Sequence, residues 1–208
     1  MKAYQFKIEL RQVDTPVFRR FIVPASIPFK RFHHVIQEVM GWKNIHLYEF
    51  VFKKEPVVFT NDYKGLEEYK FYKKKMKDFK HKPEYAQFIL KMPLKSVNNI
   101  NIDHYIEKHP KFKYVYDFHD NWKHIVTLEE VIEDYPYKYP TCLEIEGHCP
   151  PEFVGGSKGY NHFLDVWHNP SHKEYKALKG WGKSKGYGEL IDCDALNIHF
   201  SKFFRLKR

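Results

Sequence analysis

The sequence predicts an α+β fold, in which an antiparallel sheet carries an early packed helix and a helical cluster follows toward the C-terminus. Three observations predict it. Residues 3–10 alternate apolar and polar side chains with a period of two, residues 29–40 place apolar side chains at helical spacing, and helical patterns return after residue 160. Strands that come first and helices that come later are typical of α+β proteins.

The chain should begin in the order strand, strand, helix, strand. Residues 3–10 and 17–23 are expected to pair as antiparallel strands, because a turn sequence separates them. The helix that follows has Ser26 as its expected N-cap and Gly41 as its expected C-terminal stop. Residues 46–52 alternate again and predict the next strand.

The later elements are predicted by alternation, turn residues and capping residues. They are a strand at 87–94, a hairpin over 114–128, a helix over 160–170, a helix after the capping box Ser171–Glu174, and a last helix capped by Asp192 or Asp194.

Length and composition predict one domain over residues 1–208 in the cytoplasm. The 208 residues suit one large domain, and no apolar run is long enough to cross a membrane. The N-terminal residues lack the apolar core of a signal peptide. The three cysteines are an odd number, which does not favour a disulfide framework and agrees with a reducing compartment.

A basic insertion is expected at about residues 53–86. Within it, residues 64–82 hold eight lysines against three acidic residues, in a chain whose formal net charge is +9. One interpretation is a contact with nucleic acid or with an acidic protein, and the other is a solvated helix face. The candidate contact residues are Lys70, Lys73, Lys74, Lys75 and Lys77.

Cys142, His148 and Cys149 are the candidate metal ligands. Zinc is held by thiolate and imidazole groups, but closed sites normally show two close pairs of ligands, and a second pair is not evident. The alternative is that all three are ordinary buried or turn residues, and no cofactor is expected.

A second candidate site combines carboxylates with histidine. Asp117, Asp120 and His124 could hold a hard cation and supply a base, as a metal-dependent hydrolase requires. The alternative is that Asp120 shapes the hairpin turn while His124 packs in the sheet. A binding cleft beside this hairpin is expected from His46, Glu49, Trp122, Glu152 and Tyr160.

Several motifs in a fixed order resemble a known family. They are TPVFRRFIVP, FHHVIQEVMGW, HLYEF, YVYDFHDNWKH, TCLEIEGHCPPE and GGSKGY. Together they resemble the plasmid pRiA4b ORF-3-like family over about residues 4–204. The resemblance implies an α+β fold with an antiparallel sheet, and a link to plasmids or mobile elements through the family's accessory and resolvase-like (TnpR-like) labels. The chain carries His119 and Phe153 where the family pattern has glycine and aspartate.

These observations favour a basic, non-enzymatic binding or accessory protein, linked to plasmids or mobile elements and able to bind nucleic acid without sequence preference. The alternative is a metal-dependent hydrolase built on the carboxylate and histidine cluster. The first predicts a basic surface, and the second predicts that the named acids and histidines converge in one cleft.

Overall fold

The computed structural model describes residues 1–75, 84–189 and 191–206, and these residues form an α+β fold as predicted. The strands are β1 (Ala3–Leu10), β2 (Phe18–Pro24), β3 (Tyr48–Phe52), β4 (Val57–Thr60), β5 (Leu94–Ser96), β6 (Lys111–Tyr116), β7 (Trp122–Ile132) and β8 (Thr141–Glu146). The helices are α1 (Phe29–Met40), α2 (Tyr63–Lys75), α3 (Glu84–Leu90), α4 (Asp103–Ile106), α5 (Gly156–Trp167), α6 (Tyr175–Ser184) and α7 (Cys193–Phe203).

The strands form one eight-stranded sheet in the order β5-β4-β3-β6-β7-β1-β2-β8. The predicted pair β1–β2 and the predicted hairpin β6–β7 are both antiparallel. The sheet is mixed rather than purely antiparallel, because β5 runs parallel to β4. The short edge strand β5 therefore departs from the predicted antiparallel arrangement.

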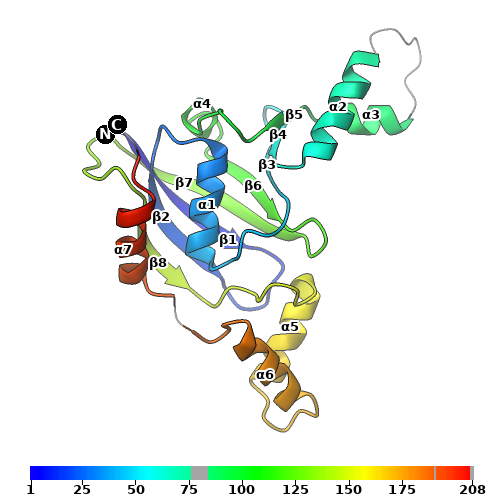
Figure 1. The fold of residues 1–208 in the computed structure, drawn as a ribbon, viewed down its shortest axis with the longest axis vertical. Coiled ribbons are helices and arrows are strands. Elements are labelled where there is room, and N and C mark those ends of the chain that lie inside the picture. Colours follow the sequence, from blue (N-terminus) through cyan, green and yellow to red (C-terminus); the bar gives the residue numbers. More distant parts are fainter. Residues whose placement is uncertain (76–83, 190, 207–208) are drawn as a thin grey trace.

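Helix α1 lies across one face of the sheet (Figure 1) and supplies the centre of the core. Phe29 stacks on Phe59 with ring centroids 4.3 Å apart, and Phe32 lies 4.9 Å from Phe6. These rings are fully buried, so aromatic packing joins the helix to strands from both halves of the sheet.

The two ends of α1 are held differently. Gly41 has φ +90° and closes the C-terminal end as predicted, with its N–H donating to the carbonyl of Gln37. The predicted Ser26 cap is wrong, since Pro28 is the N-cap and no side chain caps the helix. Main-chain carbonyls of Val97 and Ile100 accept from the first helical N–H groups instead, so tertiary contacts replace a local cap.

Two predictions for the later elements are wrong and one is confirmed. Residues Glu84–Leu90 form α3, where a strand over 87–94 was expected. The Ser171 capping box is absent, because Glu174 is the N-cap of α6 and makes no side-chain cap bond. Asp192 caps α7 as expected, by accepting from the main-chain N–H groups of Asp194 and Ala195.

The helices other than α1 lie around the sheet (Figure 1), and α5 and α7 still add buried side chains to the core. Figure 1 shows α2 and α3 projecting away from the sheet near β5, and α5 and α6 at the opposite end of the structure. Helix α7 lies beside β8, where the Asn197 side chain bonds both the main-chain N–H and the carbonyl of Cys142. In the described residues, no helix is long and apolar enough to cross a membrane.

Candidate functional site

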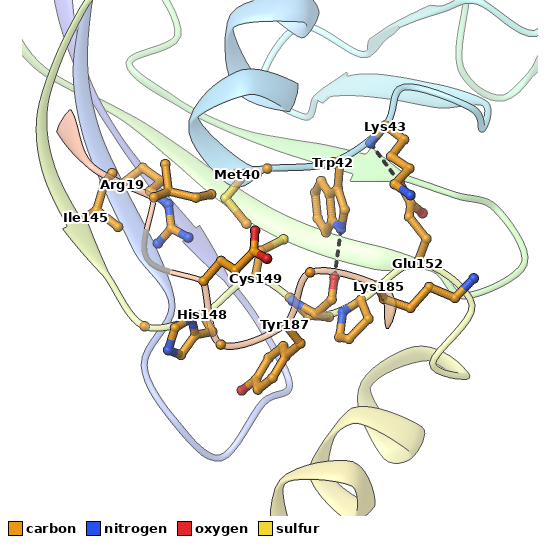
Figure 2. A pocket seen from close by; sticks show the side chains of 18 residues that line it. Arg19, Met40, Trp42, Lys43, Ile145, His148, Cys149, Glu152, Lys185 and Tyr187 are labelled. Atoms are coloured by element: carbon orange, nitrogen blue, oxygen red, sulfur yellow. Dashed lines mark hydrogen bonds between the residues drawn. The ribbon is translucent and has the colours of Figure 1, made fainter. Parts of the chain in front are cut away.

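A pocket of about 450 Å³ opens where the C-terminal end of α1 meets β8 and two loops (Figure 2). Its walls come from Arg19 on β2, residues 40–43 at the end of α1, residues 145 and 147–152 around the end of β8, and residues 185–189 and 191 between α6 and α7. We call it the Arg19 pocket. Volumes of this size are common for small-molecule sites, and four distant segments of the chain build this one.

The loop after β8 owes its path to particular residues. Gly147 has φ +69°, and a Cβ atom there would lie 2.2 Å from the carbonyl oxygen of Pro16, so only glycine fits without a shift of the main chain. Pro150 presents its carbonyl to the Trp42 indole N–H at 3.1 Å. This bond joins the loop to the end of α1, and Figure 2 shows it across the pocket.

Arg19 is the most deeply buried charged side chain of the pocket lining, with 1% of its surface exposed. Its Nε donates to the carbonyl of Val39 at 2.7 Å, and its Nη1 donates to the carbonyls of Phe18 and Glu146 at 2.8 and 2.6 Å. Burial lowers the pKa of Arg19 from its usual value, although a guanidinium remains charged in proteins. The side chain therefore holds a positive charge against three main-chain carbonyls.

A polar cluster adjoins the pocket through Glu152. The His46 cluster consists of His46, Tyr116, Asp117 and Glu152. His46 Nε2 lies 3.3 Å from Glu152 Oε2 and 3.5 Å from Asp117 Oδ2, and both acids are more than nine-tenths buried. The Tyr116 hydroxyl donates to Glu152 Oε1 at 2.9 Å, and the main-chain N–H of Lys43 donates to the same oxygen at 3.1 Å. Three of the predicted residues thus meet here.

The other predicted catalytic residues lie outside this cluster. Asp120 Oδ2 accepts from the main-chain N–H of Gly155 at 3.3 Å, which joins the hairpin to the loop before α5, while the side chain that bonds within the turn is Asp117, through the N–H of His119. His124 is fully buried beside Trp42 and Tyr114, and burial lowers its pKa to about 3. It is therefore a neutral packing residue near pH 7.

The remaining residues of the predicted cleft are dispersed. Trp122 is buried in the core. Tyr160 is also buried, and its hydroxyl donates to the carbonyl of His148 at 2.7 Å. Burial, with a contribution from Asp62, raises the pKa of Glu49 above its usual value.

The structure does not gather Cys142, His148 and Cys149 into a metal site. The Cys142 sulfur lies 3.1 Å from the sulfur of Cys193, next to α7. Burial raises the pKa of both Cys142 and Cys149 well above the usual thiol range, which disfavours the thiolate that zinc requires. Within the described residues, no three His, Cys, Asp or Glu side chains form a group that could hold a metal ion. The same finding applies to Asp117, Asp120 and His124.

Four of the five predicted basic contact residues lie on α2. Lys70, Lys73, Lys74 and Lys75 are exposed there, whereas Lys77 lies outside the described residues. Exposed aromatic rings accompany them, with Phe71 50% and Tyr63 72% exposed.

Arg19 was not among the predicted site residues, although the sequence contains a signal for it. In the alternating strand, Arg19 occupies the same face as Val17 and Phe21, which is the face that the core requires. A charged residue in a core-facing position indicates a special role. Tyr187 and Lys185 belong to a glycine-rich loop that also lines the pocket. No sequence pattern in this loop predicts that it lies near β8.

Comparisons with known proteins agree with this architecture. An uncharacterised protein, y4hQ of Sinorhizobium fredii (strain NBRC 101917 / NGR234), is 33% identical over 183 residues, which are 88% of this chain and 82% of that protein. The crystal structure of a protein of unknown function, MM3350 from Methanosarcina mazei Go1, matches with a TM-score of 0.70 and 26% identity, over 93% of this chain and 97% of that one. The model of the family described as plasmid pRiA4b ORF-3-like protein matches residues 2–199. The chain therefore belongs to the plasmid pRiA4b ORF-3-like family.

Proposed function

We propose that this protein is a non-enzymatic binding protein whose ligand occupies the Arg19 pocket. The observation that supports it most is the construction of the pocket, in which aromatic walls and a few polar groups converge from four segments of the chain. His46, Asp117 and Glu152 converge beside the pocket, but in the described residues they form no group that could hold a metal ion. Two other candidate site residues are unsuited to act as a nucleophile or a base. Cys149 is held as a thiol by a raised pKa, and His124 is held neutral inside the core.

A pocket-filling variant and a matched control can test this proposal. Ile145 lines the pocket, and Leu143 is 43% exposed on the same strand. Saturation-transfer NMR with a panel of amino acids, nucleotides, sugars and small organic acids should detect at least one binding class with wild type. That signal should disappear in Ile145→Trp and persist in Leu143→Trp. If no class binds, or if Ile145→Trp binds as wild type does, the pocket is not the functional site.

Nucleic-acid binding by α2 is the second candidate, and the exposed lysines and aromatic rings of this projecting helix support it (Figure 1). Lysines would neutralise phosphates while the rings stack on bases, without sequence preference. An acidic protein surface is the alternative partner for the same lysines. The family name supports an association with plasmids or mobile elements, and the three free thiols support a cytoplasmic location.

Fluorescence anisotropy with a single-stranded oligonucleotide at several salt concentrations tests this candidate. Replacing four α2 lysines with glutamine should lower the slope of log K against log salt by about 3, because each phosphate contact contributes about 0.7. The replaced residues are Lys70, Lys73, Lys74 and Lys75, and the control replaces the exposed Lys158, Lys173, Lys176 and Lys183. Binding that does not change with salt would exclude the candidate.

A further inference from the structure

Among the described residues, the buried guanidinium of Arg19 has no acidic partner, since all of its hydrogen bonds go to main-chain carbonyls. The titratable groups near its charge are thiols and a phenol, from Cys142, Cys149, Cys193 and Tyr160. None of these is a carboxylate. Buried charges in proteins are normally paired, because removing a charge from water is costly unless an opposite charge accompanies it. A bound anion would therefore supply the opposite charge that the buried Arg19 lacks.

One end of the Arg19 guanidinium is available for that anion. Its Nε and Nη1 are used by three main-chain carbonyls, whereas Nη2 has no hydrogen-bond partner in the part of the chain that the structure describes. Arg19 also lines the pocket. In Figure 2, Arg19 lies at one side of the pocket and Lys43 and Glu152 at the other, with Trp42 and Cys149 between them. A ligand that enters the pocket can therefore reach the free N–H groups of Nη2.

The charges around the pocket favour an anion with one charge. Three cationic side chains line it, from Arg19, Lys43 and Lys185, together with two carboxylates, from Glu152 and Glu189. One negative charge would balance this set. A phosphate dianion would carry more charge than the lining balances, and it would find one free guanidinium nitrogen where phosphate sites normally offer several donors.

The walls of the pocket favour an apolar body on that anion. Met40, Trp42, Ile145, Tyr187 and Ile191 all line it, and Trp42 and Tyr187 are each 8% exposed. Flat aromatic side chains with their polar atoms already bonded accept aryl or alkyl groups. The Trp42 indole N–H is bonded to Pro150 in this way.

We infer that the Arg19 pocket binds a small organic acid, with a single carboxylate at Arg19 Nη2 and an apolar or aryl body against Trp42 and Tyr187. This inference rests on the proposed function, because it names the ligand class of the same pocket. It makes Arg19 a binding residue as well as a structural one. The competing explanation is that Arg19 only clamps the three carbonyls.

Acids paired with their neutral amides distinguish these explanations without any mutation. The probes are benzoate, phenylacetate and hydrocinnamate, each with its primary amide, titrated by calorimetry against the wild-type protein. At least one acid should bind. Its amide should bind with an affinity lower by a factor of about ten or more, because the amide loses a charge-assisted hydrogen bond. Inorganic phosphate, added as a competitor, should not displace the acid at equal concentration.

Neighbouring arginines provide the matched variants. Arg20 follows Arg19 on β2 but faces the other side of the sheet, where it bonds Glu129. Arg19→Met should abolish acid binding, Arg19→Lys should weaken it, and Arg20→Met should leave it unchanged. Thermal unfolding of each variant shows whether it is folded, and the acid and amide comparison decides the question if Arg19→Met is not.

Each contrary result has its own meaning. If acid and amide bind equally and Ile145→Trp removes both, the pocket is a binding site but Arg19 is not an anion site. Displacement of the acid by equimolar phosphate would overturn the assignment to carboxylates. If no acid binds while another class in the NMR panel does, this inference fails and the proposed function stands.

Discussion

Two buried histidines should make the fold sensitive to mild acid. Burial lowers the pKa of His33 to about 3, and it lowers the pKa of His124 to about 3 as well. Both side chains have no exposed surface. In the unfolded chain each has a pKa of about 6.5, so the unfolded state takes up protons at mildly acidic pH that the folded state does not. Stability is therefore lost as the pH falls below about 6.5.

The hydrogen bonds around His33 explain why it must be neutral. The Gln37 amide donates to the Tyr114 hydroxyl at 3.0 Å, and that hydroxyl lies 2.8 Å from His33 Nδ1. His33 Nε2 lies 2.7 Å from Asn44 Oδ1. Nε2 thus donates to the amide oxygen while Nδ1 accepts from the tyrosine. A proton on Nδ1 would remove that acceptor, in a ring that also stacks on Tyr48 at 3.4 Å.

The size of the effect follows from the pKa values. At about pH 4.5 each histidine lies about two units below its unfolded pKa and above its folded pKa, which costs about 2.7 kcal/mol per histidine. Together His33 and His124 should remove about 5 kcal/mol between pH 7 and pH 4.5. That is a large share of the about 5–15 kcal/mol that stabilises a typical domain.

Urea unfolding followed by tryptophan fluorescence at the two pH values measures this loss. Carboxylates also titrate in this range, so the informative quantity is the difference between wild type and His124→Leu. The variant should lose about 2.7 kcal/mol less than wild type between the two pH values, whatever its stability at pH 7. His119→Leu, at an exposed position, is the control and should lose as much as wild type. Equal losses in wild type and His124→Leu would refute the reasoning.

Three further changes test the walls of the pocket and the edge of the sheet. Gly147→Ala forces a positive φ and a Cβ clash with the Pro16 carbonyl, so the free energy of unfolding should fall by about 2 kcal/mol or more in urea; an unchanged midpoint would contradict the geometry. Trp42→Phe removes the indole bond to the loop before α5, and should cost about 1–3 kcal/mol in the same assay. Diamide should oxidise Cys142 and Cys193 to a disulfide by accepting two electrons and two protons. By chain entropy the closed loop adds about 4 kcal/mol, and Cys193→Ser should show no gain.

The sequence predicts the centre of the fold well, because side-chain alternation reports burial directly. The strands β1 and β3 and the helix α1 each show one mainly apolar face, and that face is the buried one, whereas β2 breaks the pattern with Arg19 on its core face. The wrong prediction at 87–94 comes from a short apolar run, whose type periodicity cannot decide. In α3 the apolar residue Phe88 is 75% exposed while Ala86 is buried, so hydrophobicity gave no indication of the packed face.

The candidate site was predictable only in part. His46, Asp117 and Glu152 were named individually and do meet, but their meeting depends on how the β8–α5 loop passes the β6–β7 hairpin. No local pattern encodes that approach. Asp117, whose side chain belongs to this cluster, has φ +56°, which is unusual for a residue other than glycine. The sequence pattern did not predict this conformation.

The position of Arg19 joins the stability of the fold to the pocket. Its carbonyl partners lie at the first residue of β2, at the last residue of β8 and in the last turn of α1, where the helix dipole also favours a positive charge. The same side chain thus fixes the mutual position of three elements and presents Nη2 to the pocket. Arg19 is held in this position only in the folded state, so a ligand that bonds Nη2 binds the folded state alone. It should therefore stabilise the fold as a whole rather than the loop alone. Ligand binding in this pocket should therefore raise the melting temperature. Arg19→Lys keeps the charge but loses the planar donors, so it should lower the stability of the fold and reduce the rise in melting temperature on binding.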